Sequence, residues 1–360
     1  MKKKLGIALK PLMIGLAAAV LPLFIVLDGL YLLRQGVSLF ALLRGSKPIE
    51  TLLLQDSIDP ATKDFLLRAQ DIKRYAVEEL GLEDTPNYST FIHTDRKHLV
   101  DVVSAVREDS LIRYERTYPL VGKVFYRGYF NREHAEWYAA RLKRRGFDVL
   151  IRKVGAYSSL GYLTDPLYSY MADYNVHRLA EMIIHEQVHA TIWHPGHNVF
   201  NEEIAVFIAR EGALSYIRSR FGEDPRLIEN IEQERRDYET LGGIFTSIYK
   251  ELNEIYTRTP LREERLAVKE RILQQKQEEF SFNYNRLFLT ERYAWLKTAV
   301  WDHALIDVYI QYGGDLSLYY RLYESLNADL DAMLQFLRAL EGNPKEMLRN
   351  RAGVLARTKL

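Results

Sequence analysis

The motif His185-Glu186-Gln187-Val188-His189 constrains the fold most strongly, because its two histidines can act together only on a helix. Apolar residues recur before it at helical spacing: Val176, Leu179, Ala180, Ile183 and Ile184. Residues four apart lie on the same helix face, so His185 and His189 can bind one cation. Glu186 projects about 100° away from His185, which suits a general base better than a third ligand. The chain must therefore bring a third ligand to this helix from elsewhere.

The residues after the motif offer several third ligands. Trp193-His194-Pro195-Gly196 predicts that the helix ends near Ile192. A second helix is expected from Asn201, which we interpret as its N-cap. The candidate ligands are Glu202 and Glu203 on that helix and, less favoured because they lie in the loop, His194 and His197. Adjacent helical residues point about 100° apart, so only one glutamate should face the cation, and the other fits a first-turn acid favoured by the helix dipole.

The remaining sequence predicts a mostly helical α+β protein with one small sheet near residues 99–163. Pro60 opens a helix that Gly81 ends, and Asn131 caps a second helix over 132–145. The strands are expected at 99–106, 123–129, 147–154 and 155–163, after a short amphipathic segment at 36–56. Everything after Pro166 is expected to be helical, including long charged helices at 226–256 and 261–280. The charge run 232–237 fits a solvated helix face.

We expect four parts along the chain. They are an anchor or signal segment (1–33), a helical lead-in (34–98), a catalytic core (99–225), and a helical part that completes the active-site cleft (226–360). The core holds the sheet, the H-E-x-x-H motif and the N-E-x-x-A sequence that starts at Asn201. The 49 Lys and Arg balance 48 Asp and Glu, which argues against a nucleic-acid partner. The absence of cysteine excludes disulfides, thiolate ligands and a cysteine nucleophile.

The N-terminus resembles a membrane anchor. Lys2, Lys3, Lys4 and Lys10 precede an uncharged stretch from Pro11 to Leu27, which extends to Leu33 if Asp28 lies among the headgroups. Helices of these lengths span roughly 26 to 34 Å, against a hydrocarbon core of about 30 Å. The alternatives are a cleaved signal peptide, with Ala17-Ala18-Ala19 as a cleavage site, and a buried core helix. The preceding lysines predict a periplasmic body, which protease added to intact spheroplasts should digest.

Several segments resemble the bacterial putative zinc aminopeptidase family, a set of membrane-associated predicted peptidases with the gluzincin arrangement of thermolysin-like enzymes. They are residues 118–122, 126–130, 154–161, 165–166, 185–189, 201–212, 283–287 and 313–316. The resemblance covers about residues 30–325 and implies a zincin-like helical core, a Zn²⁺ cofactor and peptide substrates. It also implies Glu202 as third ligand, because the family's Asn-Glu pair aligns with Asn201-Glu202. Many relatives carry a lipid-modified cysteine, which the apolar segment replaces here. Residues 301–304 depart from the expected apolar pattern.

Together these features predict peptide hydrolysis at a zinc held by His185, His189 and Glu202, with Glu186 as general base. Tyr157 and Tyr293 are candidate donors to the oxyanion. The segment 155–163 can pair with an extended peptide as an edge strand, or be a buried strand packed closely through its glycines. The candidate partners for a substrate α-amine are Glu181, Glu203 and Asp165. Two other function classes stay open: a zinc hydrolase of another amide, such as one in the cell wall, and a membrane-anchored binding or chaperone-like protein with a vestigial site.

Overall fold

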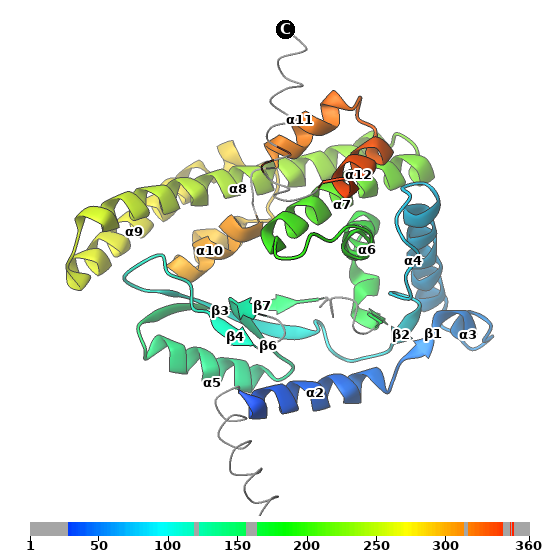
Figure 1. Ribbon diagram of the computed structural model, residues 1–360, viewed down its shortest axis with the longest axis horizontal. Coiled ribbons are helices and arrows are strands. Elements are labelled where there is room, and N and C mark those ends of the chain that lie inside the picture. The colour runs from blue at the N-terminus through cyan, green and yellow to red at the C-terminus, as the bar shows by residue number, and fades with distance from the viewer. Residues whose placement is uncertain are drawn as a thin grey trace, which may run out of the picture.

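The computed structural model describes residues 28–118, 122–155, 164–312 and 316–340, together with Glu346 and Leu348. Within these residues the fold is α+β and mostly helical, as expected (Figure 1). The helices are α2 (Gly29–Leu43), α3 (Ile49–Leu53), α4 (Pro60–Glu78), α5 (Arg132–Lys143), α6 (Val176–Thr191), α7 (Asn198–Phe221), α8 (Pro225–Arg258), α9 (Arg262–Leu287), α10 (His303–Tyr312), α11 (Ser317–Ser325) and α12 (Leu330–Arg338), with 3₁₀ turns η1 (Ser169–Asp173) and η2 (Ala294–Lys297). The strands are β1 (Lys47–Pro48), β2 (Thr90–Ile92), β3 (Val100–Arg107), β4 (Arg116–Tyr118), β5 (Gly122–Val124), β6 (Tyr126–Tyr129), β7 (Phe147–Val154) and β8 (Leu167–Tyr168).

The main sheet has the order β6-β3-β7, and β3 is antiparallel to both neighbours. Strand β3 reads VDVVSAVR and is buried along almost its whole length, because both faces of the sheet are covered. Helix α5 packs on one face through Tyr138 and Leu142, and Tyr31 of α2 joins the same cluster. On the other side of the sheet, α10 lies against β3 and β7. The sheet therefore separates α2 and α5 from the larger helical part of the molecule (Figure 1).

A second small sheet ties together segments that are far apart in sequence. Its order is β1-β2-β8, with β2 antiparallel to β1 and parallel to β8. Because β8 leads through η1 into α6, this sheet fixes the start of the motif helix next to the lead-in helix α4. The third sheet is the two-stranded hairpin β4-β5.

Helices α4, α6 and α7 form the centre of the largest hydrophobic core. Ile183, Ile184 and Phe207 are fully buried there. A Cβ added at Gly212 of α7 would lie 2.8 Å from Leu80 and 3.4 Å from Ile184. The glycine thus lets α7 pack closely against Leu80, and Ile184 of α6 lies beside it.

A separate core lies among α8, α9 and α10. Asp224 caps α8 and Pro225 occupies its first turn, which accounts for the start of this 34-residue helix. Phe245 of α8 and Phe280 of α9 both pack edge-on against Trp301. The two long helices therefore have apolar inner faces, although their sequences are highly charged.

Three sequence expectations need correction. The strand expected at 123–129 is two strands, of which β5 pairs with β4 and β6 pairs with β3. The chain after Pro166 is not wholly helical, because β8 pairs with β2. In place of one amphipathic segment at 36–56, the structure has α2 and the short helix α3, with strand β1 between them.

Two other expectations fall largely on residues that the structure does not describe. The strand expected at 155–163 lies outside the described residues except for Gly155, as does the uncharged stretch 11–27. No helix within the described ranges is both long and apolar enough to cross a bilayer.

Candidate metal centre

Helix α6 carries the motif between two well-defined ends. Asn175 caps its start by accepting a hydrogen bond from the Arg178 amide at 2.8 Å. Its last helical residue is Thr191, followed by Ile192, as the sequence predicts. The Thr191 hydroxyl donates to the Gln187 carbonyl at 2.7 Å and accepts from the Glu83 amide at 2.9 Å. These bonds hold the last turn of α6, which carries His189.

Helix α7 begins at Asn198, three residues before the predicted cap, so the interpretation of Asn201 as an N-cap is wrong. Asn201 is fully buried, and its side chain clamps the preceding loop. Its Oδ1 accepts from the His194 amide and its Nδ2 donates to the His194 carbonyl, both at 2.9 Å. This side chain fixes the loop between α6 and α7 and hence the position of the adjacent Glu202.

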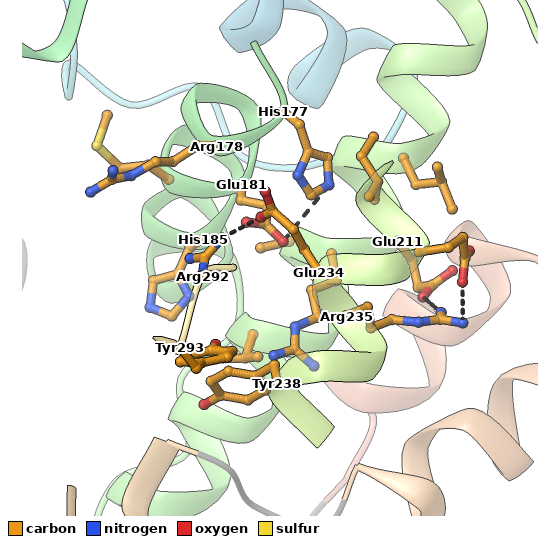
Figure 2. A pocket seen from close by; sticks show the side chains of 17 residues that line it. His177, Arg178, Glu181, His185, Glu211, Glu234, Arg235, Tyr238, Arg292 and Tyr293 are labelled. Atoms are coloured by element: carbon orange, nitrogen blue, oxygen red, sulfur yellow. Dashed lines mark hydrogen bonds and ion pairs between the residues drawn. The ribbon is translucent and has the colours of Figure 1, made fainter. Parts of the chain in front are cut away.

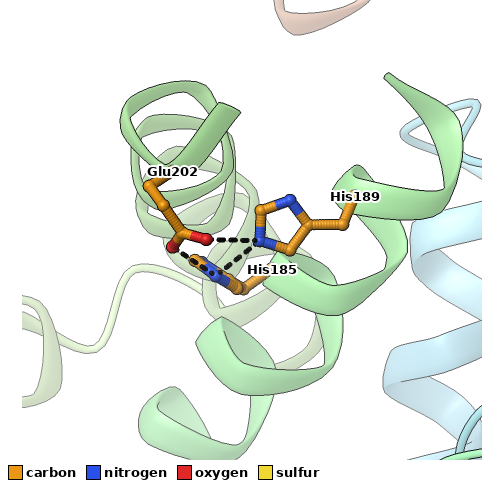
Figure 3. Close-up of side chains that lie close together, drawn as sticks. All are labelled: His185, His189 and Glu202. Atoms are coloured by element: carbon orange, nitrogen blue, oxygen red, sulfur yellow. Dashed lines mark hydrogen bonds and ion pairs between the residues drawn. The ribbon is translucent and has the colours of Figure 1, made fainter. Parts of the chain in front are cut away.

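The structure brings His185, His189 and Glu202 into one group that could hold a metal ion (Figure 3). The two Nε2 atoms are 3.1 Å apart. Glu202 Oε2 lies 3.6 Å from His185 Nε2, and Glu202 Oε1 lies 3.5 Å from His189 Nε2. Tetrahedral zinc ligands at about 2.0–2.1 Å from the ion are separated from one another by about 3.4 Å. The three separations therefore suit one small tetrahedral cation.

The protonation states of the group also suit a cation. Burial, assisted by the charge of His185, lowers the pKa of His189 to about 4, so this imidazole is neutral at pH 7. Burial alone would raise the pKa of Glu202, but the His185 hydrogen bond and the histidine charges lower it overall. For His185 burial lowers the pKa, but the Glu202 hydrogen bond and nearby carboxylates raise it overall. A neutral His189 and an ionised Glu202 are the forms in which these side chains bind a metal cation.

The other three candidate ligands lie elsewhere. Glu203 is buried and accepts a hydrogen bond from the Tyr319 hydroxyl at 2.8 Å. His194 Nε2 lies 3.2 Å from the Leu337 carbonyl oxygen and thus connects the loop to α12. His197 is the N-cap residue of α7. Within the described residues, Glu202 is therefore the candidate that joins the two motif histidines.

A pocket of about 370 Å³ opens beside His185 (Figure 2). It is lined by residues of α6, α7 and α8 and by the segment that follows α9. Tyr293 lies in its wall, packed against Phe288 and Tyr309. Burial raises the pKa of the Tyr293 hydroxyl, which therefore stays protonated and able to donate. The other predicted donor, Tyr157, lies outside the described residues.

The pocket wall carries charges that the sequence interpretation missed. Arg292 pairs with Glu234. Arg235 lies 2.7 Å from Glu232 and 3.7 Å from Glu211. The run 232–237 is therefore not simply a solvated helix face, since Glu232, Glu234 and Arg235 line this pocket. In the sequence, these charged residues are followed on the same helix by the apolar residues Leu241 and Phe245, which are buried. That pattern predicts that one face of α8 packs against the protein, but it does not identify the helix that α8 faces.

Glu181 differs from the other carboxylates of the pocket. It lies one helical turn before His185 and contacts His177, with His177 Nε2 3.8 Å from Glu181 Oε1. Burial lowers the pKa of His177, so this imidazole is neutral at pH 7 and does not offset the carboxylate charge. Figure 2 shows Glu181 and His185 projecting from the same helix toward the pocket.

The fold and the site define an α+β protein with a candidate metal centre made by an H-E-x-x-H helix and a glutamate of the next helix. More specifically, the chain belongs to the Putative aminopeptidase family, whose profile matches residues 30–352. This confirms the family resemblance seen in the sequence. Membership suggests a peptidase and implies peptide substrates. No curated protein and no solved structure matches the chain significantly.

Proposed function

We propose that this chain is a zinc aminopeptidase. The observation that carries the proposal is the spacing of three donors, at 3.1, 3.5 and 3.6 Å, on two helices beside a pocket. Two imidazoles and one carboxylate form a typical catalytic zinc set that leaves a position open for water or substrate. Bound zinc would supply a Lewis acid and lower the pKa of water at the centre.

Side chains of the protein would then transfer protons and donate a hydrogen bond during the reaction. Glu186 follows His185 directly on α6 and would accept a proton from the attacking water and deliver it to the leaving amine. A neutral tyrosine hydroxyl would donate a hydrogen bond to the carbonyl oxygen as negative charge develops there. Tyr293 suits that role because it lines the same pocket as His185, and Tyr157 is the alternative from the sequence.

The Glu186→Gln variant tests this mechanism. It keeps the side chain's shape and leaves the three donors untouched, so zinc should remain near one per chain. Peptide hydrolysis should fall by about 10²- to 10⁴-fold, because general acid–base catalysis is lost. Glu78→Gln on the exposed face of α4 is the matched control and should be fully active. Wild-type turnover in Glu186→Gln with bound zinc would contradict the role of Glu186 as general base, and peptide hydrolysis absent from the wild-type protein with bound zinc would contradict the peptidase function.

We propose further that Glu181 binds the substrate's α-amine. An aminopeptidase needs a negative group near the metal for that ammonium, and the other pocket carboxylates already face arginines. Glu203 is an unsuitable alternative because it is buried against Tyr319, and Asp165 is not in the pocket wall. The geometry therefore favours cleavage next to a free amino terminus over cleavage within a chain.

A pair of peptides, one free and one acetylated at its amino terminus, tests the role of Glu181. Glu181→Gln should raise KM for the free peptide about 10- to 100-fold, since hydrogen bonds to charged groups contribute roughly 1.5–3 kcal/mol. The kcat and the zinc content should change little. Equal cleavage of the two peptides by the wild type would contradict an aminopeptidase and leave the zinc peptidase assignment intact.

A further inference from the structure

Helix α2 turns an apolar stripe toward solvent. Leu30, Leu33, Val37 and Phe40 follow one another at spacings of three, four and three residues, and each is 58–64% exposed. A helix on the surface of a soluble domain normally directs its polar residues outward. In α2 the outward face is apolar, although the side chains that contact the body include Tyr31 and the polar Gln35.

Specific contacts hold α2 in this orientation. The Tyr31 hydroxyl donates to the Gly128 carbonyl at 2.9 Å, and the Arg127 guanidinium lies 3.7 Å from the centre of the Tyr31 ring. Gln35 Oε1 accepts from the Phe130 amide at 3.2 Å. Asp28, just before the helix, forms an ion pair with Arg116. These contacts bind the opposite face of α2 to the sheet, and the stripe therefore points away from the body.

The charges of α2 and of the segment that follows it are all of one sign, whereas α5 beside it also carries the exposed Glu133 and Glu136. Residues 29–47 contain no Asp or Glu, but they include Arg34, Arg44 and Lys47. Helix α5 covers the same face of the sheet and presents Trp137, which is 61% exposed, with the Arg141 guanidinium 5.8 Å from its ring centre. Apolar residues edged by arginine, lysine and tryptophan suit the boundary between anionic headgroups and acyl chains.

We propose that α2 lies flat on a lipid bilayer, with its stripe in the acyl boundary and its basic residues among the headgroups. Fifteen helical residues extend only about 22 Å, too short for a hydrocarbon core of about 30 Å, so α2 rests on the membrane and does not span it. The uncharged sequence 11–27 precedes Asp28 and α2 in the chain. This surface is distinct from the metal centre and does not depend on the proposed peptidase activity.

The orientation has a consequence for substrate access. Figure 1 shows α2 along the lower edge of the molecule, with the main sheet between it and the helices α6 and α7. A bilayer beneath α2 would therefore leave the side that carries the metal centre facing the aqueous phase. Soluble peptides could reach the pocket while the body remained at the membrane surface.

The full-length chain permits a clean test because it contains no cysteine. Phe40→Cys and Phe282→Cys make the same change on exposed helical phenylalanines of α2 and α9, and Phe282 is 91% exposed. Each variant carries an environment-sensitive fluorophore and is reconstituted in phosphatidylcholine vesicles containing phosphatidylglycerol. Lipids with a quencher on their acyl chains should quench the probe at 40 severalfold more than the probe at 282. Equal, weak quenching at both positions would overturn the proposal.

A second matched pair of cysteine variants shows whether the quenching reflects the whole stripe or only a local effect of one substitution. Val37→Cys and Val300→Cys should repeat the contrast, since Val37 belongs to the stripe and Val300 is an exposed valine outside it. Replacing both Arg34 and Arg44 by Glu should reduce quenching at position 37 in the anionic vesicles. A probe at 37 that is shielded from water but is not quenched by lipid would show that a second copy or another protein covers the stripe, which contradicts lipid docking.

Discussion

Two clusters of histidine and carboxylate in this molecule differ in how their polar atoms are paired. In the candidate metal centre, His185, His189 and Glu202 direct three donor atoms at one point, and His189 Nδ1 has no hydrogen-bond partner within the described residues. In the second cluster, between the main sheet and α10, His303 is fully bonded. Its Nδ1 donates to the Arg107 carbonyl at 2.8 Å, and its Nε2 accepts from the Tyr256 hydroxyl at 3.0 Å.

The carboxylate of the second cluster is also occupied. Asp148 accepts from the His303 amide at 3.0 Å and from Lys269 Nζ at 2.9 Å. Within the described residues, the His303 amide, His303 Nδ1 and Lys269 Nζ each meet an acceptor of the chain itself. The comparison shows that composition alone does not mark a site, because both clusters contain histidine and acid. Convergence of donors on a shared point beside a pocket distinguishes the first cluster from the second.

Replacing one histidine in each cluster should distinguish a loss of zinc binding from a loss of folding stability. The largest effect is expected on zinc affinity, at the metal centre. His189→Ala should lower zinc affinity by more than the roughly 10- to 100-fold that follows loss of an outer partner. Zinc titration against a competing chelator gives this affinity. The unfolding midpoint of the metal-free protein should change little, because removal of His189 relieves the burial of a polar side chain.

His303→Ala should have the opposite pattern. It leaves the Tyr256 hydroxyl and the Arg107 carbonyl without their partner, which should cost roughly 3 kcal/mol of unfolding free energy. Zinc affinity should match the wild type, since His303 is not among the pocket residues. Urea denaturation of the metal-free proteins measures the stability. A loss of zinc in His303→Ala without a loss of stability would remove the distinction between the two clusters.

A smaller effect should appear in the pH dependence of stability. Burial lowers the pKa of His303 in the folded state, so below about pH 6.5 the unfolded chain binds a proton that the folded chain does not. Stability is therefore full above this pH and decreases as the pH falls. Between pH 7.5 and 6 the wild type should lose more stability than His303→Gln, by at most about 0.8 kcal/mol, the limit set by the ordinary histidine pKa of the unfolded chain.

The lower limit of pH 6 restricts an opposing contribution of the neighbouring Asp302 to the pH dependence of stability. Burial raises the pKa of Asp302 to about 6, so its folded form takes up a proton first and gains stability as the pH falls further. Measurements of unfolding by urea at both pH values, for wild type and His303→Gln, isolate the histidine. Equal pH dependence in the two proteins would mean that His303 titrates alike in the folded and unfolded states.

The parts of the structure that follow from local sequence were predicted well. Helix α6 ends where the sequence Trp193-His194-Pro195-Gly196 stops it, and β7 has the expected bounds 147–154. The spacing of His185 and His189 is a property of one helix, so their proximity could be inferred without a tertiary structure. The family resemblance, in turn, pointed to Glu202, the residue that the structure brings to the two histidines.

The parts that depend on distant segments could not be read from the sequence. Strand β8 is only two residues long and exists because β2 lies beside it. The side chain of Asn201 bonds to the loop behind it, whereas its residue type and position suggested a cap. Likewise, the sequence left Glu203 as a candidate ligand or a first-turn acid, but Tyr319, 116 residues further along the chain, donates to it in the core.

The adjacent residues Glu202 and Glu203 permit the most direct test of the metal centre. Zinc content of the purified variants Glu202→Ala and Glu203→Ala is measured by elemental analysis, with metal-free stability as a check on folding. Glu202→Ala should lose zinc and keep its fold. Glu203→Ala should keep zinc near one per chain but lose about 1–3 kcal/mol of stability, because the buried Tyr319 hydroxyl loses its acceptor. Zinc retained in Glu202→Ala and lost in a folded Glu203→Ala would contradict the proposed centre.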